Sequence, residues 1–274
     1  MKPIIKWAGG KQKLLPQILP HIPKEYNWYH EPFLGGGALF WSLQPKKAII
    51  SDANQELVNF YQQVKDNLPK LLQEISNFGD IDEELFYELR DLDRAFSYKE
   101  YSDIKKAARF LFLNKTCYNG LYRVNKQGQF NTPYGKYKNP KIYNLREMKN
   151  AFHLLNPPNQ ISVLNKLYTD VLKASSKGDF VYFDPPYHSV KKTSFVSYNK
   201  SIFGEKDHID LKNLCVRLTQ RGVKFLLSNS YTDFTVDLFS SGGEFWVSTI
   251  KAKRYINSNA EGRGDVKEIL VKNY

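Results

Sequence analysis

Four consecutive residues, Asp184-Pro185-Pro186-Tyr187, carry the groups needed to bind a planar base with an exocyclic amino group. The carboxylate of Asp184 and the carbonyls of a proline-fixed turn can accept the two amino hydrogens, since proline has no N–H of its own. The ring of Tyr187 gives such a base a face on which to stack. Taken alone, the tetrapeptide fits an ordinary strand end followed by a Pro-Pro loop equally well.

Two glycine motifs nearer the N-terminus could hold a smaller ligand. In Lys6-Trp7-Ala8-Gly9-Gly10-Lys11, the loop N–H groups and the Lys11 ammonium favour a carboxylate or a phosphate. A simple turn with a surface lysine would have the same sequence. Gly35-Gly36-Gly37 lies between an expected strand and an expected helix over 38–43, where glycines allow a ligand to approach the backbone closely.

An acid follows the second glycine motif at a distance typical of ribose binding. Asp52 comes 17 residues after Gly35, close to the ~20-residue offset of an acid that binds ribose hydroxyls. Phe40 stands where the G-x-G-x-x-G pattern needs its third glycine. This departure disfavours a dinucleotide and leaves an adenosine-bearing cofactor without a pyrophosphate. Asp52-Ala53-Asn54 could instead be only the N-cap of the next helix.

The positive charge of the chain, +12 in total, is concentrated in one region. Residues 104–141 contain nine Lys or Arg and no Asp or Glu. Within them, 118–138 interleaves tyrosines with cations, and its Asn-Gly and Gln-Gly pairs predict hairpin-like turns. Cations hold phosphates, and aromatic rings stack on bases or wedge between them. We therefore interpret this segment as a nucleic-acid interface in preference to a solvated basic loop.

Short apolar runs predict the strands that must position these motifs. They cover 28–33, 48–50, 161–164, 180–183, 223–228, 245–247 and 268–271. The run 180–183 ends directly at Asp184, and open α/β sheets bind ligands at the carboxyl ends of their strands. Helical patterns from residue 56 to about 115 exceed what one crossover needs. We expect a discontinuous α/β catalytic domain, 1–56 and 164–274, interrupted by an inserted domain, 57–163.

Composition also bears on membrane segments, disulfides and metal sites. Since the chain has no run of about 18 apolar residues and no signal-peptide core at its start, we expect no membrane span. Cys117 and Cys215 are far apart, and the five histidines show no metal-ligand spacing. We therefore expect no disulfide, no metal and a reducing cytoplasm. The polar, aromatic-containing segment 189–203 is predicted to be a mobile lid over the site.

With these motifs in place, the sequence resembles the α-group DNA adenine N6-methyltransferases, specifically the Dam type that methylates GATC. The motifs follow the family order: the Lys6–Lys11 loop, Glu31-Pro32-Phe33-Leu34-Gly35-Gly36-Gly37, Asp52, an inserted recognition domain, and Asp184–Tyr187. The resemblance implies a Rossmann-like sheet whose last strand is antiparallel, with a mainly helical DNA-recognition insert that carries a hairpin. It also implies S-adenosyl-L-methionine as cofactor. By motif position, the cofactor-binding residues are Trp7, Lys11, Phe33, Gly35, Gly37, Asp52 and Asp184.

The resemblance implies that a flipped adenine enters the Asp184–Tyr187 site. Asp184 and the Pro185 carbonyl would accept the two N6–H bonds, which localises the nitrogen lone pair for attack on the cofactor's methyl group. Pro186 would keep the turn rigid, and Tyr187 would stack on the base.

The resemblance also assigns double-stranded DNA as the partner and 118–138 as the segment that reads it. The residues implied are Tyr118 as a wedge in the duplex, Leu121 and Pro133 as apolar base contacts, Arg123 on a guanine, and Asn119 among them. Lys136 stands where the family often has arginine. A lysine can neutralise a phosphate, but it lacks the guanidinium fork needed to read a base.

Three rival functions follow from the same motifs. An RNA or protein amide N-methyltransferase would share the chemistry, but those families mostly carry Asn before Pro-Pro-Tyr, and Asp184 argues against them. A catalytically silent DNA-binding protein would have no need for the cofactor motifs. A nicotinamide-dependent oxidoreductase lacks support because the third glycine is missing. The same motifs also fit a recognition site other than GATC, with or without a partner restriction enzyme, and a monomer would suffice.

Overall fold

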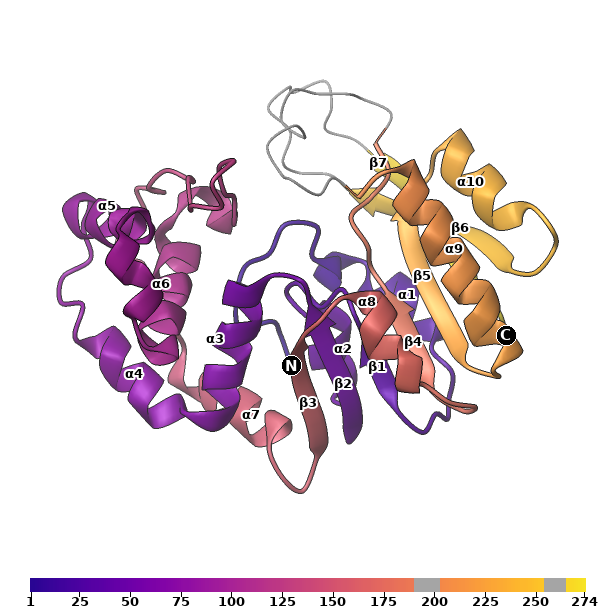
Figure 1. The fold of residues 1–274 in the computed structure, drawn as a ribbon, viewed down its shortest axis with the longest axis horizontal. Helices are drawn as coiled ribbons and strands as arrows, with labels where there is room; N and C mark the ends of the chain where they lie inside the picture. The colour runs from indigo at the N-terminus through magenta and orange to yellow at the C-terminus, as the bar shows by residue number, and fades with distance from the viewer. Residues whose placement is uncertain (190–202, 254–264) are drawn as a thin grey trace.

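The strands predicted from the short apolar runs form one sheet. The computed structural model describes residues 1–189, 203–253 and 265–274 (Figure 1). Seven strands are arranged in the order β3-β2-β1-β4-β5-β7-β6. Their bounds are β1 Tyr29–Glu31, β2 Lys47–Asp52, β3 Gln160–Asn165, β4 Phe180–Phe183, β5 Lys224–Ser230, β6 Trp246–Lys253 and β7 Asp265–Lys272.

Five of these strands are parallel, and the last strand of the chain reverses direction. β3, β2, β1, β4 and β5 pair in parallel, whereas β7 is antiparallel to both β5 and β6. The predicted α/β sheet with an antiparallel last strand is therefore confirmed. β6 is longer than the run 245–247 suggested, because its continuation, Ser248-Thr249-Ile250-Lys251, is polar edge strand with little apolar pattern.

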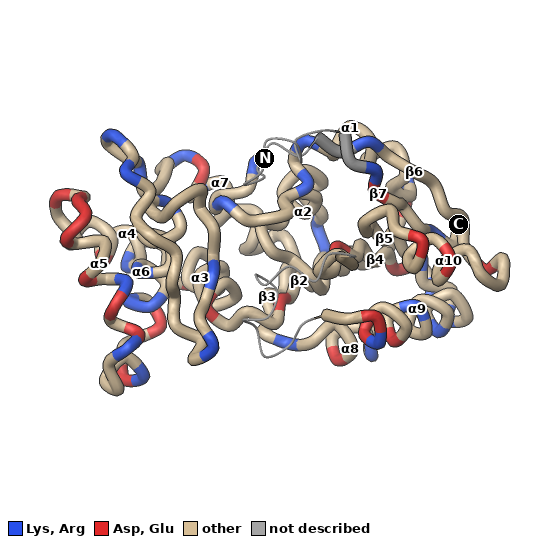
Figure 2. The backbone as a smooth tube through the Cα atoms, turned by 90° about the horizontal axis from the view of Figure 1, so that it is seen from above, with Lys and Arg blue, Asp and Glu red and all other residues tan. Residues whose placement is uncertain are grey.

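Helices cover both faces of the sheet. Figure 2 shows α1 and α2 on one face and α8 and α9 on the other. The bounds are α1 Leu15–Ile18, α2 Ala38–Leu43, α8 Tyr168–Val171, α9 Glu205–Gln220 and α10 Asp233–Ser240. The apolar spacing of residues 14–22 produces only the four residues of α1 between two 3-10 turns, because Pro16 and Pro20 lack the N–H groups that a longer helix requires.

Five helices lie between the parallel neighbours β2 and β3, and Figure 1 shows them gathered at one end of the molecule. Side chains cap the N-termini of four of them: Asn54, Asp82, Ser102 and Asn144 each accept a hydrogen bond from a backbone N–H in the first turn. The helices are α3 Gln55–Asp66, α4 Leu68–Ser76, α5 Glu83–Asp91, α6 Asp103–Thr116 and α7 Leu145–Leu155.

The hydrophobic core has two parts. One cluster runs from β1, β2 and α2 into the helices α3 to α7, and includes Phe40, Tyr61 and Phe110. The other lies between α9 and the strands β4, β5 and β7, and includes Leu218 and Phe225. Successive residues of β4 and β5 alternate between the two clusters, as Tyr182 and Phe183 do, so the clusters cover opposite faces of the sheet.

The predicted hairpin-like segment follows α6. Antiparallel bridges join Cys117 to Tyr134 and Val124 to Phe130. Its turn is closed by the Asn125 N–H, which donates to the Gln129 carbonyl at 2.8 Å.

Of the predicted lid over 189–203, residues 190–202 lie outside the described part of the chain. Among the residues that the structure describes, no helix is both long and apolar enough to cross a membrane.

Candidate active site

The carboxyl edge of the sheet brings together motifs that are far apart in the chain. β1 leads into Gly35-Gly36-Gly37, β2 ends at Asp52, and β4 ends one residue before Asp184. Because β1, β2 and β4 are parallel neighbours, these three groups meet at one edge.

Asp184 is the point at which the first and last motifs meet. Its Oδ1 forms an ion pair with the Lys11 ammonium at 2.7 Å and accepts a hydrogen bond from the Ser228 hydroxyl at 3.1 Å. The same ammonium lies 4.5 Å from the centre of the Tyr187 ring and donates to the Gly9 carbonyl at 2.8 Å. Lys11 is only 5% exposed, so the alternative of a surface lysine on a simple turn is wrong. Its side chain is built into the site.

A buried acid lies beside this cluster. Glu31 is 2% exposed and accepts hydrogen bonds from the Tyr29 hydroxyl at 2.6 Å and the Phe40 N–H at 3.1 Å. Burial raises the pKa of the Glu31 carboxyl to about 8, and the nearby charge of Asp184 adds to the rise. Glu31 is therefore mainly protonated near neutral pH, which leaves Asp184 as the anionic partner of Lys11.

Asp52 connects β2 to the glycine loop. Its Oδ2 accepts from the Gly35 N–H at 2.9 Å, and its Oδ1 accepts from the Asn54 N–H at 2.9 Å. Burial raises the pKa of this carboxyl, while the two backbone hydrogen bonds oppose the rise. The side chain that caps α3 is Asn54, whose Oδ1 accepts from the Leu57 N–H. Asn54 is therefore the N-cap residue of α3, and the Asp52 carboxylate contacts the glycine loop instead.

Trp7 packs directly on the glycine loop. A Cβ atom at Gly35 would lie 2.7 Å from the Trp7 indole, and Gly35 has a φ of +48°, so only glycine suits this position. The other side of the indole stacks on Tyr122 with ring centres 5.6 Å apart. Trp7 therefore contacts both the glycine loop and the hairpin-like segment.

Phe33 belongs to an aromatic wall at the same edge. Its ring centre lies 5.0 Å from that of Tyr168 and 5.8 Å from that of Phe203. These three rings come from segments that are far apart in the chain, and together they offer an apolar surface next to the glycine loop.

The side chains predicted to contact DNA lie on the hairpin-like segment and are mostly exposed. Tyr118 is 54% exposed, and its N–H donates to the Pro133 carbonyl at 2.9 Å, which places these two residues side by side. Arg123 donates through Nε to the Asn131 side-chain oxygen at 2.7 Å and through Nη2 to the Asn131 carbonyl at 3.0 Å. Asn119, Lys136 and the partly buried Leu121 lie on the same segment. None of these six residues contacts Asp184 through a hydrogen bond or ion pair that the structure describes.

Sequence reasoning missed two residues of the site, Ser228 and Glu268. Ser228 donates to Asp184, and the Tyr187 hydroxyl donates to Glu268 Oε2 at 2.7 Å. The signal was present in both cases. Ser228 ends an apolar run, and Glu268 is an acid that directly precedes Ile269-Leu270-Val271. Both runs were interpreted only as strands.

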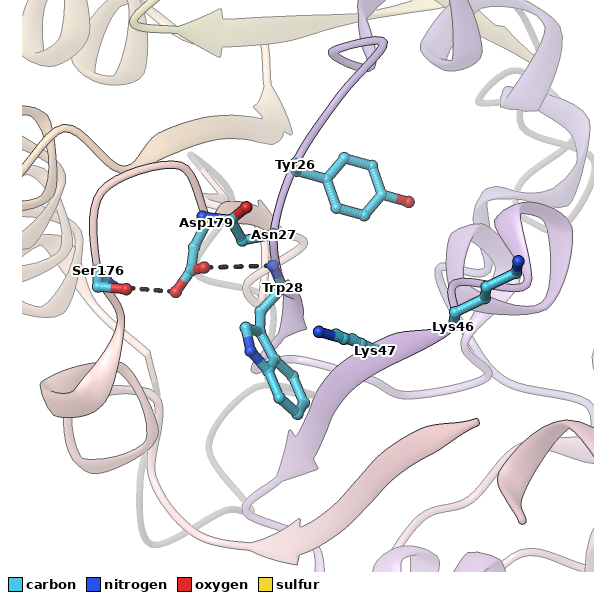
Figure 3. Close-up of a pocket in the computed structure, with 7 residues that line it drawn as sticks. All are labelled: Tyr26, Asn27, Trp28, Lys46, Lys47, Ser176 and Asp179. Carbon is cyan, nitrogen blue, oxygen red and sulfur yellow. Dashed lines mark hydrogen bonds between the residues drawn. The ribbon is translucent and has the colours of Figure 1, made fainter. Parts of the chain in front are cut away.

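One cavity lies away from this site. It has a volume of about 530 Å³ and is lined by Tyr26, Asn27, Trp28, Lys46, Lys47, Ser176 and Asp179 (Figure 3). These residues precede or begin β1, β2 and β4, so the cavity lies at the amino edge of the sheet, opposite Asp184. Asp179 is occupied by hydrogen bonds from the N–H groups of Trp28 and Ser176. The cavity contains none of the predicted site residues.

The sheet order, the antiparallel β7 and the glycine loop with its acid at the carboxyl edge define a class I methyltransferase fold. Comparison with known proteins specifies the class further. The model of the D12 class N6 adenine-specific DNA methyltransferase family matches residues 7–256, and the chain belongs to this family. The prediction of an adenine-specific DNA methyltransferase is confirmed, and family membership implies DNA as substrate and S-adenosylmethionine as methyl donor.

Relatives of this chain carry corresponding names. It is 44% identical over 294 residues to the type II methyltransferase M.MjaIII of Methanocaldococcus jannaschii, covering 100% of this chain and 99% of the relative. It is 40% identical over 276 residues to the type II methyltransferase M1.LlaDCHI of Lactococcus lactis subsp. cremoris, covering 100% and 96%. The DNA adenine methylase of Serratia marcescens is 31% identical over 274 residues, covering 97% and 96%.

Proposed function

We propose that this protein transfers a methyl group from S-adenosylmethionine to N6 of adenine within GATC in double-stranded DNA, after flipping the adenine out of the duplex. The observation that carries the proposal is the convergence of Asp184, Tyr187 and Lys11 at the carboxyl edge of the sheet. A carboxylate and an aromatic face at one point suit the amino group and the ring of a flipped base.

The residues at this edge fit the cofactor. The glycine loop, on which Trp7 packs, brings backbone rather than side chains to this edge, Asp52 presents a carboxylate for ribose hydroxyls, and Phe33 offers an apolar surface for an adenine ring. The Lys11 ammonium suits the methionine carboxylate. We assign Trp7, Lys11, Phe33, Gly35, Gly37, Asp52 and Asp184 to this site. When bound, S-adenosylmethionine supplies an activated methyl group on a sulfonium centre.

The protein's task is to make adenine N6 nucleophilic, because its lone pair is delocalised into the ring. Asp184 and the Pro185 carbonyl accept the two N6–H bonds, which orients the amino group and stabilises positive charge as it develops on N6. The rigid Pro185-Pro186 turn holds both acceptors in place, and Tyr187 stacks on the base. Asp184 acts as an acceptor and need not remove a proton before methyl transfer.

Lys11 makes, in this structure, the two contacts that we assign to adenine. Its ammonium forms an ion pair with Asp184 and lies over the Tyr187 ring. The ammonium must therefore leave Asp184 Oδ1 before the N6 amino group can use that oxygen. The methionine carboxylate would give the ammonium another anionic partner, which supports a dual role for Lys11.

We also propose that 57–163 is the recognition domain and that its hairpin-like segment reads the site. Arg123 presents a guanidinium held in place by Asn131, an arrangement suited to bidentate contact with a guanine in the major groove. Tyr118, Asn119, Leu121 and Pro133 lie beside it as base contacts, and Lys136 neutralises a phosphate. The GATC assignment depends on this segment and on the resemblance to the Dam type.

The test uses DNA from a methylation-free host that expresses this chain. The DNA is digested in parallel with a GATC nuclease that requires N6-methyladenine and with one that N6-methyladenine blocks. We expect cleavage by the first nuclease and protection from the second. The opposite pattern would refute GATC methylation, and absence of N6-methyladenine from the same DNA would refute the reaction itself.

A second candidate keeps the reaction but changes the site. Two relatives of 40% and 44% identity are named type II methyltransferases, which supports a role for this chain in a type II restriction-modification system of the cytoplasm. N6-methyladenine in the expressed DNA without GATC protection would favour a different site. Mapping the methylated adenines would then identify it.

A further inference from the structure

Three polar side chains line one face of the pair formed by β5 and β7. In the antiparallel register, Ser230 lies opposite Glu268 and Ser228 lies opposite Leu270. Side chains two residues apart on a strand share a face, as do directly opposite residues on paired strands. Ser228, Ser230 and Glu268 therefore project from the same face.

Each of the three contacts a different residue of the segment 184–188. The Ser228 hydroxyl donates to Asp184 Oδ1 at 3.1 Å, and the Tyr187 hydroxyl donates to Glu268 Oε2 at 2.7 Å. The Ser230 hydroxyl donates to the His188 carbonyl at 2.6 Å. The strand pair thus holds both side chains that we assign to adenine and the backbone that follows them.

The acid at position 268 does more than a neutral acceptor could. Glu268 is 7% exposed, and a phenol that donates to a buried carboxylate makes a short, charge-assisted hydrogen bond. The carboxylate pulls on the phenolic proton and so raises the electron density of the Tyr187 ring. The Lys11 ammonium, 4.5 Å from the ring centre, shows that this face accepts a cation.

We propose that Glu268 is a positioning residue for Tyr187 that also polarises its ring, and that Ser228 positions Asp184. The inference rests on the proposed function, because it assigns adenine to these two side chains. Methyl transfer places positive charge on the stacked base, so a more electron-rich ring stabilises the transition state more than the bound substrate. Loss of the Glu268 charge therefore lowers the rate of the chemical step and leaves binding nearly intact.

The experiment is a double-mutant cycle of Glu268→Gln and Tyr187→Phe. Glu268→Gln keeps an acceptor of the same shape and removes the charge, and Tyr187→Phe removes the hydroxyl that donates to it. Single-turnover methylation is measured on unmethylated duplex DNA containing the site, together with the dissociation constants for S-adenosylmethionine and DNA. We expect each variant to lose about tenfold in rate, with both constants changing by less than about twofold.

The combination carries the decisive result. If Glu268 acts through Tyr187, the methylation rate of the double variant stays within about twofold of the rate of the slower single variant. Multiplied losses in the double variant, or a wild-type rate for Glu268→Gln, would overturn the inference. Should Glu268→Gln not fold, Tyr187→Phe alone still tests it, because a wild-type rate without the hydroxyl would show that the bond has no kinetic role.

A matched control separates this effect from a general loss of charge. Glu244 is an exposed acid whose nearest described partner is Lys212 at 3.9 Å, away from the segment 184–188. Glu244→Gln should keep the wild-type rate. Absence of methylation by the wild-type protein would refute the proposed function, whereas the cycle refutes only the role of Glu268, so the two failures are distinguishable.

Discussion

The carboxyl edge around Asp184 and the hairpin-like segment 118–138 hold their functional side chains in opposite ways. At the edge, side chains contact one another: Lys11 forms an ion pair with Asp184, Ser228 donates to Asp184, and Tyr187 donates to Glu268. On the segment, backbone hydrogen bonds and bridges keep the shape, while Tyr118 and Arg123 are exposed. The difference indicates that the edge holds its side chains in place before DNA arrives, with Lys11 still paired to Asp184, whereas the groups that we propose to read DNA remain accessible to it.

The largest effect should come from the edge. Asp184→Ala removes the carboxylate that we assign to N6, and loss of one preorganised electrostatic contact costs about 10²–10³-fold in rate. We expect a loss near the upper end in single-turnover methylation, while DNA affinity falls by less than about threefold because the segment 118–138 is unchanged. Asp184→Asn, which keeps the shape, serves as the matched variant. Turnover retained in both variants would contradict the assignment of Asp184.

The buried edge should also respond to pH in a way that the exposed segment cannot. The pKa of Glu31 is raised to about 8 by burial, against an ordinary value of 4.5. Between pH 4.5 and about pH 8, the Glu31 carboxyl binds more protons in the folded state than in the unfolded state. The contribution of Glu31 to folding stability therefore falls as pH rises. At about 1.4 kcal/mol per pH unit, the loss across this window is roughly 5 kcal/mol.

Denaturant unfolding of Glu31→Gln and the wild type at pH 5 and pH 8 measures this contribution. The amide does not titrate, so the stability of the variant relative to the wild type should rise from pH 5 to pH 8. Arg123→Ala, on the exposed segment, is the control and should show the pH dependence of the wild type. A constant difference between Glu31→Gln and the wild type would mean that Glu31 does not titrate in this range.

More of the fold than of the side-chain contacts in the site could be predicted from the sequence. Each predicted strand followed from a local apolar run, and Asp184 was found because such a run ends at it. The contacts of Asp184 and Tyr187 could not be found in this way. Ser228 and Glu268 lie 44 and 81 residues further along the chain, and only the register of β5 with β7 puts them on one face. Local patterns define the strands, but cross-strand register decides which polar residues meet.

A smaller effect is expected from the segment that we propose to read DNA. Arg123→Ala removes the guanidinium, and a bidentate contact with guanine contributes ~1–3 kcal/mol of discrimination. We expect the ratio of methylation rates on the cognate duplex and on a duplex with a substituted guanine to fall by about 5–150-fold. Nonspecific DNA affinity should fall far less, since one phosphate-independent contact is lost. Equal loss on both duplexes would argue against direct readout by Arg123.

The smallest effect tests how the exposed segment keeps a long side chain in place. Asn131 accepts from Arg123 through its side-chain oxygen and through its backbone carbonyl, and only the first of these is lost in Asn131→Ala. A hydrogen bond of this kind contributes about 0.5–1.5 kcal/mol, so we expect discrimination to fall by roughly 2–10-fold, less than in Arg123→Ala. In the background of Arg123→Ala, Asn131→Ala should change nothing further, because its partner is absent. A further loss there would mean that Asn131 contacts DNA itself, and the segment would then hold its reading groups less independently than the comparison with the buried edge implies.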